Sequence, residues 1–216
     1  MGEGELTKLK YNVRLERCKR SNPEYQAIRD RHYIPNHGCI GQQIHYLIYL
    51  DDEIVGIISG ASSVFAVKAR DEYFGLTKEN KKAGLPSIIN NVVFRLEKNL
   101  PNLGSQILAM WRKQIAKDWE KQYHVKVHGF ETFIIENDNR KGAMYKADNW
   151  EYVGETQGST KHHNGIENKA ERIDVCKKLI FVKKIKGTKL STEYTPTWRL
   201  KGKEKQKVLE ELNKNS

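Results

Sequence analysis

Apolar and polar residues recur along this 216-residue chain with spacings that predict both helices and strands. Between residues 103 and 123 the apolar positions fall three or four residues apart, which is the spacing of an amphipathic helix. These positions are Leu103, Ile107, Leu108, Trp111, Ile115 and Trp119. Weaker helices are expected over residues 24–33 and 141–148. Residues 68–85 are polar and are expected to be irregular or weakly helical.

Shorter apolar runs predict about six strands. Residues 43–50 and 54–63 flank an acidic turn at 51–53 and form an expected hairpin. The other strands are expected over 88–97, 126–135, 150–156 and 177–185. The order of elements indicates an α/β (α+β) fold, with a largely antiparallel twisted sheet flanked by helices. We expect an N-terminal extension over 1–27, a folded domain over 28–185 and a basic tail over 186–216.

Charge is spread unevenly along the chain. Residues 1–158 hold 23 Lys and Arg against 20 Asp and Glu, whereas residues 159–216 hold 15 against 7. The net charges are therefore +3 and +8, and the total is +11. A strongly basic segment attracts phosphates without reading sequence, which favours DNA or RNA as a partner. The alternative is a solvated surface with no such partner.

Several protein classes are not indicated. No run of 18 apolar residues predicts a membrane span, and residues 1–10 lack the apolar stretch of a secretory signal. The three cysteines form no CxxC pair, so we expect reduced thiols and a cytoplasmic protein. No His or Cys spacing matches a zinc site, so no metal is expected.

The stretch 131–158 carries the most chemical information. Its pattern predicts a strand, a turn, a short helix with Tyr145 and, after Asn149-Trp150, a second strand. This layout resembles the GNAT acetyltransferase fold, in which a Tyr closes the site and the long helix holds a coenzyme A pyrophosphate. The resemblance implies that Tyr145 protonates a thiolate leaving group. The alternative is a core Tyr whose hydroxyl bonds to a backbone group.

A closer resemblance covers roughly residues 28–158. It is to the DruA family, known from Druantia anti-phage loci and some mobile genetic elements. The matching residues are His32-Tyr33, Ala69-Arg70-Asp71, Gly75, Asn90-Asn91, Phe94, Pro101-Asn102-Leu103, Ser105, Asp118-Trp119, Tyr123, Glu131-Thr132-Phe133, Gly142, Tyr145, Ala147, Asn149-Trp150 and Val153-Gly154-Glu155-Thr156. The stretch from Gly142 to Trp150 is also similar to phage Mom proteins, which share the broad fold and modify adenine in DNA.

Two carboxylates are candidate general bases. Glu131 and Glu97 lie in or at the end of predicted strands among apolar residues, where burial raises a carboxyl pKa. The alternative for either is an ion pair with Arg95 or Arg70, or an exposed strand end.

The start of the long helix is a candidate donor site. Backbone N–H groups at Asn102, Leu103, Gly104 and Ser105 are expected to hold the phosphates of acetyl-coenzyme A or another activated acyl donor. The acetyltransferase loop usually has a Gly-x-Gly-like arrangement, and this chain has a single Gly there. The alternative is ordinary helix capping.

A last group of residues is expected to contact nucleic acid. His32 and Tyr33 precede a turn and are expected to face the substrate, unless they pack a helix end on the sheet. The other expected contacts are Arg70, Lys178, Lys183, Lys184, Lys186, Trp198, Lys201 and Lys203.

These observations predict an acyltransferase that modifies an exocyclic base amine, in phage defence or a mobile genetic element. The alternative is a non-catalytic GNAT-fold subunit that binds nucleic acid within a defence or transposition complex.

Overall fold

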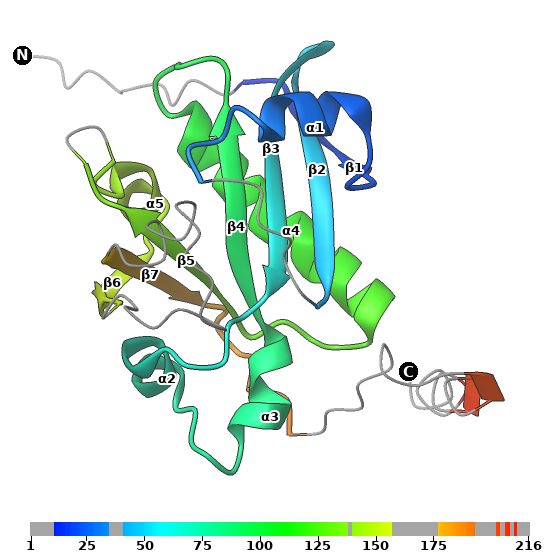
Figure 1. Ribbon diagram of the computed structural model, residues 1–216, viewed down its shortest axis with the longest axis vertical. Coiled ribbons are helices and arrows are strands. Elements are labelled where there is room, and N and C mark those ends of the chain that lie inside the picture. The colour runs from blue at the N-terminus through cyan, green and yellow to red at the C-terminus, as the bar shows by residue number, and fades with distance from the viewer. Residues whose placement is uncertain are drawn as a thin grey trace, which may run out of the picture.

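A single seven-stranded sheet organises the fold, in the order β1-β2-β3-β4-β5-β7-β6 (Figure 1). The computed structural model describes residues 11–34, 41–137, 140–156, 177–192, 202–203, 206–207 and 210. All neighbouring strands pair antiparallel except β4 and β5, which run parallel. The strands are β1 Val13–Cys18, β2 Gln43–Leu50, β3 Glu53–Ser62, β4 Ile88–Leu96, β5 Gly129–Ile135, β6 Glu151–Glu155 and β7 Lys178–Lys184. The predicted fold class is confirmed, with seven strands in place of about six.

Helices cover both faces of the sheet. The long helix α4 (Leu103–Tyr123) runs behind β2, β3 and β4 in Figure 1, and all six of its predicted apolar positions are buried. On the opposite face, α1 (Pro23–Arg29) packs Tyr25 and Ile28 against β2 and β3. Three shorter helices with described bounds are α2 Lys68–Phe74, α3 Lys81–Gly84 and α5 Ala143–Ala147. None of the helices in the described ranges is both long enough and apolar enough to cross a membrane.

The structure adds a strand before residue 28 and decides between the two alternatives for residues 68–85, which are helical. All six residues of β1 pair with β2, so part of the expected N-terminal extension belongs to the sheet. Residues 68–85 contain α2 and α3, followed by a 3-10 turn over Leu85–Ser87. In both segments the apolar pattern is too short to identify an element by itself, and packing on the sheet decides the conformation.

The sheet opens between β4 and β5. These strands pair at only three positions, from Ile88 with Gly129 to Asn90 with Glu131, and then diverge (Figure 1). β4 also contains a bulge. Gly60 of β3 pairs with Asn91, whereas the residue before it, Ser59, pairs with Val93, so one β4 residue between them has no partner in β3. The bulge leaves one extra residue in β4 beside the opening.

Candidate active site

A cavity of about 240 Å³ lies between β4 and β5 beyond their last paired residues. Four segments line it: 32–34 after α1, residues 91, 92 and 94 in β4, 132–134 in β5 and 140–145 leading into α5. We call this cavity the cleft. It exists because two parallel strands separate, and it gathers residues that are more than one hundred positions apart in sequence.

Tyr145 is a buried residue at the edge of the main hydrophobic core, and it lines the cleft. The hydroxyl donates a hydrogen bond of 2.7 Å to Asn91 Oδ1, and Thr132 Oγ1 lies 3.5 Å from it. The ring is held edge-on to Trp150 at 5.1 Å and stacked on Phe181 at 6.0 Å. Burial raises the pKa of Tyr145 above its ordinary value of 10.0. The phenol is therefore a fixed, neutral hydrogen-bond donor.

Asn91 connects Tyr145 to the bulge. Its Nδ2 group donates to the carbonyls of Ser59 (3.0 Å) and Val93 (3.2 Å), which flank the bulge. The backbone carbonyl of Asn91 accepts a hydrogen bond of 3.0 Å from Thr132 Oγ1. The sequence pattern alone predicts no chemical role for Asn91. The sequence feature that points to Asn91 is the pair Asn90-Asn91 within an apolar strand, because a buried polar side chain needs several hydrogen-bond partners.

The pair His32-Tyr33 lines the same cleft as Tyr145. Their rings are 4.6 Å apart, and the Arg140 guanidinium lies 4.0 Å from the centre of the Tyr33 ring. His32 Nδ1 lies 3.1 Å from the amide nitrogen of Ile34. Burial and then the charge of Arg29 lower the pKa of His32 to about 4, so its imidazole is neutral near pH 7. Contact of His32 and Tyr33 with nucleic acid remains a prediction.

Glu131 lies on the other side of β5 from Tyr145's partner Thr132. Its carboxylate is fully buried and is ion-paired with the fully buried guanidinium of Arg70, which also contacts Asp71 (2.8 Å) and the Val64 carbonyl (2.6 Å). The ion pair considered as the alternative for Glu131 is present. Burial raises the Glu131 pKa and the positive charge of Arg70 opposes this. The prediction that Arg70 contacts nucleic acid is wrong, because its charge is enclosed in this network.

Glu97 follows the end of β4 and is not among the described residues that line the cleft. Its carboxylate accepts a hydrogen bond of 2.6 Å from Arg95 and lies 3.4 Å from Arg31. The hydrogen bond from Arg95 lowers the pKa of Glu97. The structure therefore places neither predicted carboxylate base beside the Tyr145 hydroxyl.

The first turn of α4 presents the predicted donor-binding residues. Asn102 has a left-handed backbone (φ 62°), and its carbonyl accepts from Ser105 Oγ at 3.0 Å. Leu103 is buried in the core. Within the described residues, the N–H groups of Gly104 and Ser105 form no hydrogen bond, so they are available to an anion.

Gly104 also has a packing role. A Cβ atom added to it would lie 2.5 Å from Met144 Sδ in α5, so the glycine lets α5 approach the start of α4. Tyr11 lies beside the same turn, with its backbone bonded to the Gln106 side chain at 3.1 and 2.7 Å.

The predicted lysines on β7 do not form one surface. Lys183 Nζ donates to the carbonyls of Asp148 (2.6 Å) and Asn149 (2.9 Å), and burial lowers its pKa. Lys184 lies on the other face of the strand, 4.4 Å from the Tyr73 ring. Lys183 is therefore a structural contact of the segment after α5.

The rest of the basic group is dispersed. Lys178 is half-buried at the opposite end of β7, and Lys186 is exposed just beyond the strand. Lys203 is exposed. Trp198 and Lys201 lie outside the described residues, so their expected contacts remain predictions.

The sheet opening, the α4 start and the Tyr145 helix define a protein with the GNAT acetyltransferase fold. Arabidopsis thaliana NAA60 in complex with acetyl-CoA has a TM-score of 0.51 and 15% identity, covering 81% of this chain and 99% of that chain. A Bacillus subtilis acetyltransferase in complex with CoA has a TM-score of 0.49 and 11% identity, covering 80% and 99%. A GNAT family acetyltransferase from Elizabethkingia anophelis with acetyl-CoA bound has a TM-score of 0.49 and 10% identity, covering 82% and 100%.

The family is more specific than the fold. Residues 4–212 match the family model described as Druantia protein DruA, so this chain belongs to the DruA family. The resemblance found in the sequence is thereby confirmed, and the match extends through both ends of the domain. The comparison with curated proteins gave no match.

Proposed function

We propose that this protein transfers an acyl group from an acyl-coenzyme A thioester to an amine of DNA or RNA, as part of defence against phage. One observation carries the proposal: a neutral phenol, Tyr145, is fixed by a hydrogen bond at the wall of a cleft formed by the opening of β4 from β5. The fold supports the class of reaction, and the family supports the setting.

The transfer needs a proton donor at the leaving group. The amine nitrogen forms a C–N bond to the acyl carbon, the C–S bond breaks, the nitrogen loses a proton and the sulfur gains one. A donor of this type supplies an activated acyl group. The single hydroxyl hydrogen of Tyr145, which is donated to Asn91 Oδ1 in the free protein, turns to the departing sulfur and is transferred to it. Such general-acid assistance is typically worth about 10²–10⁴-fold in rate. Its raised pKa keeps the proton on the oxygen at neutral pH.

The residues present fit such a donor. The unbonded N–H groups of Gly104 and Ser105 are suited to phosphate oxygens at the start of a helix of 21 residues. The cleft between β4 and β5 leads to the Tyr145 hydroxyl. We therefore assign Asn102 to Ser105 to donor binding and Tyr145 to the acyl end.

The acceptor side of the cleft suits a base. Tyr33 presents a ring already paired with Arg140, and a base must leave the stack before its amine can reach a buried hydroxyl. Of the described residues that line the cleft, none is a carboxylate. The neutral imidazole of His32 is the group we assign to accept the amine proton: Nε2 takes the proton, and Nδ1 carries the ring hydrogen towards the Ile34 carbonyl, 3.3 Å away. The net charge of +8 over residues 159–216 favours a nucleic-acid acceptor.

The test is a direct search for product. The full chain is incubated with acetyl-coenzyme A or other acyl-coenzyme A thioesters and with DNA or RNA. Free thiol release is followed, and the polymer is digested to nucleosides for mass spectrometry. Acylated nucleosides with wild type, and at least tenfold fewer with Tyr145→Phe, are the expected result. Unmodified nucleosides with every donor and both polymers would count against the proposal.

A second candidate is a nucleic-acid-binding subunit without catalysis. The observation that favours it is the crowding of the α4 start by Met144 and Tyr11, together with the single glycine. Thermal unfolding with coenzyme A discriminates the two. A ligand at 100 times its dissociation constant stabilises the folded state by about 2.7 kcal/mol, whereas a closed donor site gives no shift.

A further inference from the structure

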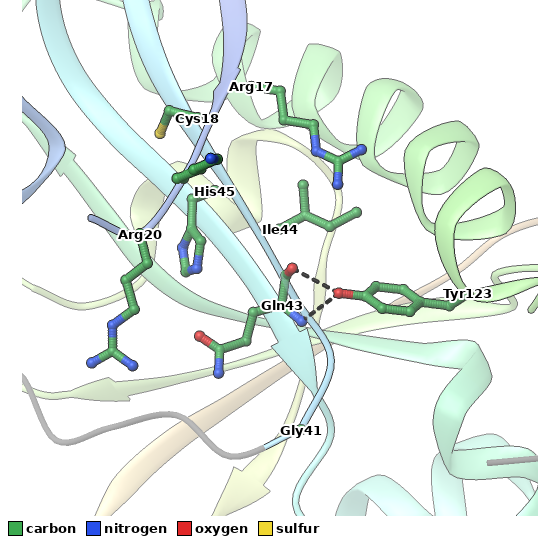
Figure 2. Close-up of a pocket in the computed structure, with 9 residues that line it drawn as sticks. Arg17, Cys18, Arg20, Gly41, Gln43, Ile44, His45 and Tyr123 are labelled. Atoms are coloured by element: carbon green, nitrogen blue, oxygen red, sulfur yellow. Dashed lines mark hydrogen bonds between the residues drawn. The ribbon is translucent and has the colours of Figure 1, made fainter. Parts of the chain in front are cut away.

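A second hollow lies at the far end of the sheet from the opening between β4 and β5. It has a volume of about 670 Å³ and sits where β1 ends and β2 begins, beside the C-terminal end of α4 (Figure 2). Its cations are Arg17, Lys19 and Arg20, and its other lining residues include Gln43 and Tyr123. We call it the β1 hollow. None of its residues was a candidate in the sequence.

The charged residues among those that line the β1 hollow are all cations. No Asp or Glu is among its described lining residues, and Arg17 and Lys19 are exposed. Within the described part of the chain, neither Arg17 nor Lys19 has an ion pair. Since residues 1–158 carry a net charge of only +3, three cations around one hollow are a local concentration of charge. A desolvated, neutral imidazole, His45, adds no charge, because its pKa is lowered to about 4.

The frame that carries these cations is fixed. The Tyr123 hydroxyl accepts a hydrogen bond of 2.9 Å from the backbone N–H of Gln43 and donates one of 2.8 Å to the backbone carbonyl of Gln43. These two bonds connect the end of α4 to the start of β2 (Figure 2). Cys18 pairs with His45 across the two strands. His45 in turn lies 3.0 Å from Ser59 Oγ. A ligand therefore meets a preformed wall.

The positions of the cations indicate a ligand with more than one phosphate. Arg17 extends towards α4, and Arg20 extends to the other side of His45 (Figure 2). Cations that extend in different directions suit a ligand whose negative charges are spaced along its length. A nucleic-acid strand offers one negative charge at each successive phosphate.

We propose that the β1 hollow binds the phosphate backbone of a nucleic-acid strand, at a site separate from the Tyr145 cleft. In this site Arg17, Lys19 and Arg20 contact phosphates. This binding does not depend on acyl transfer, so it stands or falls separately from the proposed function.

Cys18 provides a probe within the β1 hollow of the unmodified protein. Its thiol is half-buried there, and burial raises its pKa to about 11, so alkylation is run at about pH 9 to obtain a measurable rate. Peptide-resolved mass spectrometry separates Cys18 from the other two cysteines. Saturating oligonucleotide should slow alkylation of Cys18 at least fivefold. An unchanged rate with the oligonucleotide fully bound would overturn the proposal.

Two further additives identify the ligand. A mononucleotide or polyglutamate is added at the same concentration of negative charges as the oligonucleotide. The alkylation rate of Cys18 should then stay within twofold of its rate in the free protein. Equal protection by the mononucleotide would show a small-phosphate site, and equal protection by polyglutamate would show a general polyanion surface. Either result overturns a strand-binding site.

A charge-matched pair of triple variants gives the second measurement. Arg17→Gln, Lys19→Gln and Arg20→Gln are combined in one protein. Lys68→Gln, Lys78→Gln and Lys82→Gln, which remove three exposed charges outside the β1 hollow, form the control. Each phosphate contact contributes about 0.7–0.9 to the slope of log affinity against log salt. We expect the first variant to lose about 2–3 from that slope and at least tenfold in affinity near physiological salt.

The control variant should lose less than threefold in affinity for the oligonucleotide near physiological salt. Equal losses in the two variants would mean that diffuse charge, not the β1 hollow, holds the strand. Circular dichroism of both variants verifies that they fold, and the Cys18 measurement on wild type decides the question if one does not.

Discussion

Replacing Tyr145 by Phe removes the hydroxyl that is bonded to Asn91 and leaves the ring in place. The ring contacts with Trp150 and Phe181 do not involve the hydroxyl, so packing is preserved. What is lost is the 2.7 Å hydrogen bond to Asn91 Oδ1. Asn91 is 4% exposed, so water does not readily replace the lost donor.

The magnitude follows from that orphaned acceptor. A buried acceptor left without a donor costs about 1–3 kcal/mol in the free energy of unfolding. In a protein of this size each kcal/mol lowers the unfolding temperature by about 2–4 °C. The matched control is Tyr152→Phe, because Tyr152 is half-exposed on the edge strand β6 and its variant should stay within about 0.5 kcal/mol of wild type.

The catalytic part of the prediction is separate from the stability part. If Tyr145 protonates the leaving sulfur, Tyr145→Phe should lower acyl transfer about 10²–10⁴-fold, measured by thiol release under conditions where both proteins are folded. Any loss of rate from ionisation of the Tyr145 phenol should appear only above pH 10, because burial raises its pKa. A destabilised variant with full activity would refute the proton-donor role and leave a core tyrosine. An unchanged stability would refute the reasoning about Asn91.

Three other perturbations test the structure. Glu131→Gln should destabilise the fold by about 3–5 kcal/mol in urea unfolding, because it leaves the buried Arg70 charge unbalanced. The control is Glu97→Gln, which alters a partly exposed ion pair and should cost about 1 kcal/mol or less; similar values for the two variants would contradict the burial of Glu131. Gly60→Ala should cost about 1–3 kcal/mol, because its methyl group would overlap side chains of α4 and β4, and a neutral result would mean that α4 shifts easily. His45 has a pKa of about 4 in the folded state against 6.5 in the unfolded state, so its contribution to the free energy of unfolding is full above pH 6.5 and is lost as the pH falls towards 4. His45→Gln should reduce that loss of stability by on the order of 1–2 kcal/mol after allowance for solvent screening. Parallel curves of unfolding free energy against pH for the variant and wild type would contradict this.

Local patterns predicted the elements that are long or strongly periodic. The α4 apolar positions were identified because their spacing is a local property, and Tyr145 was found because its helix sits between two predictable strands. β1 was not found, since it is an edge strand with exposed charges at Arg14, Glu16 and Arg17, and its partner lies about thirty residues away. The β1 hollow was missed for the same reason.

The contacts that decide chemistry are long-range and were less accessible. Arg70 was considered as a partner for Glu131, but the two are 61 residues apart and sequence offered no means to choose between an ion pair and a base. The role of Asn91 required the bulge in β4, which depends on the pairing of β3 with β4.

The opening of the sheet and the placement of Tyr145 have one cause. Beyond Asn90, β4 and β5 form no further backbone pairs, so polar backbone groups need other partners. Thr132 supplies one by donating its side-chain hydroxyl to the Asn91 carbonyl, and the Asn91 side chain supplies others by donating to the carbonyls of Ser59 and Val93. Both Asn91 amide hydrogens are thereby used, which leaves Oδ1 as an acceptor facing the cleft. Tyr145 fills that need, so the residue that stabilises the open strand also fixes the phenol. Substitutions at Asn91 should for this reason alter the shape of the cleft and the position of its proton donor together.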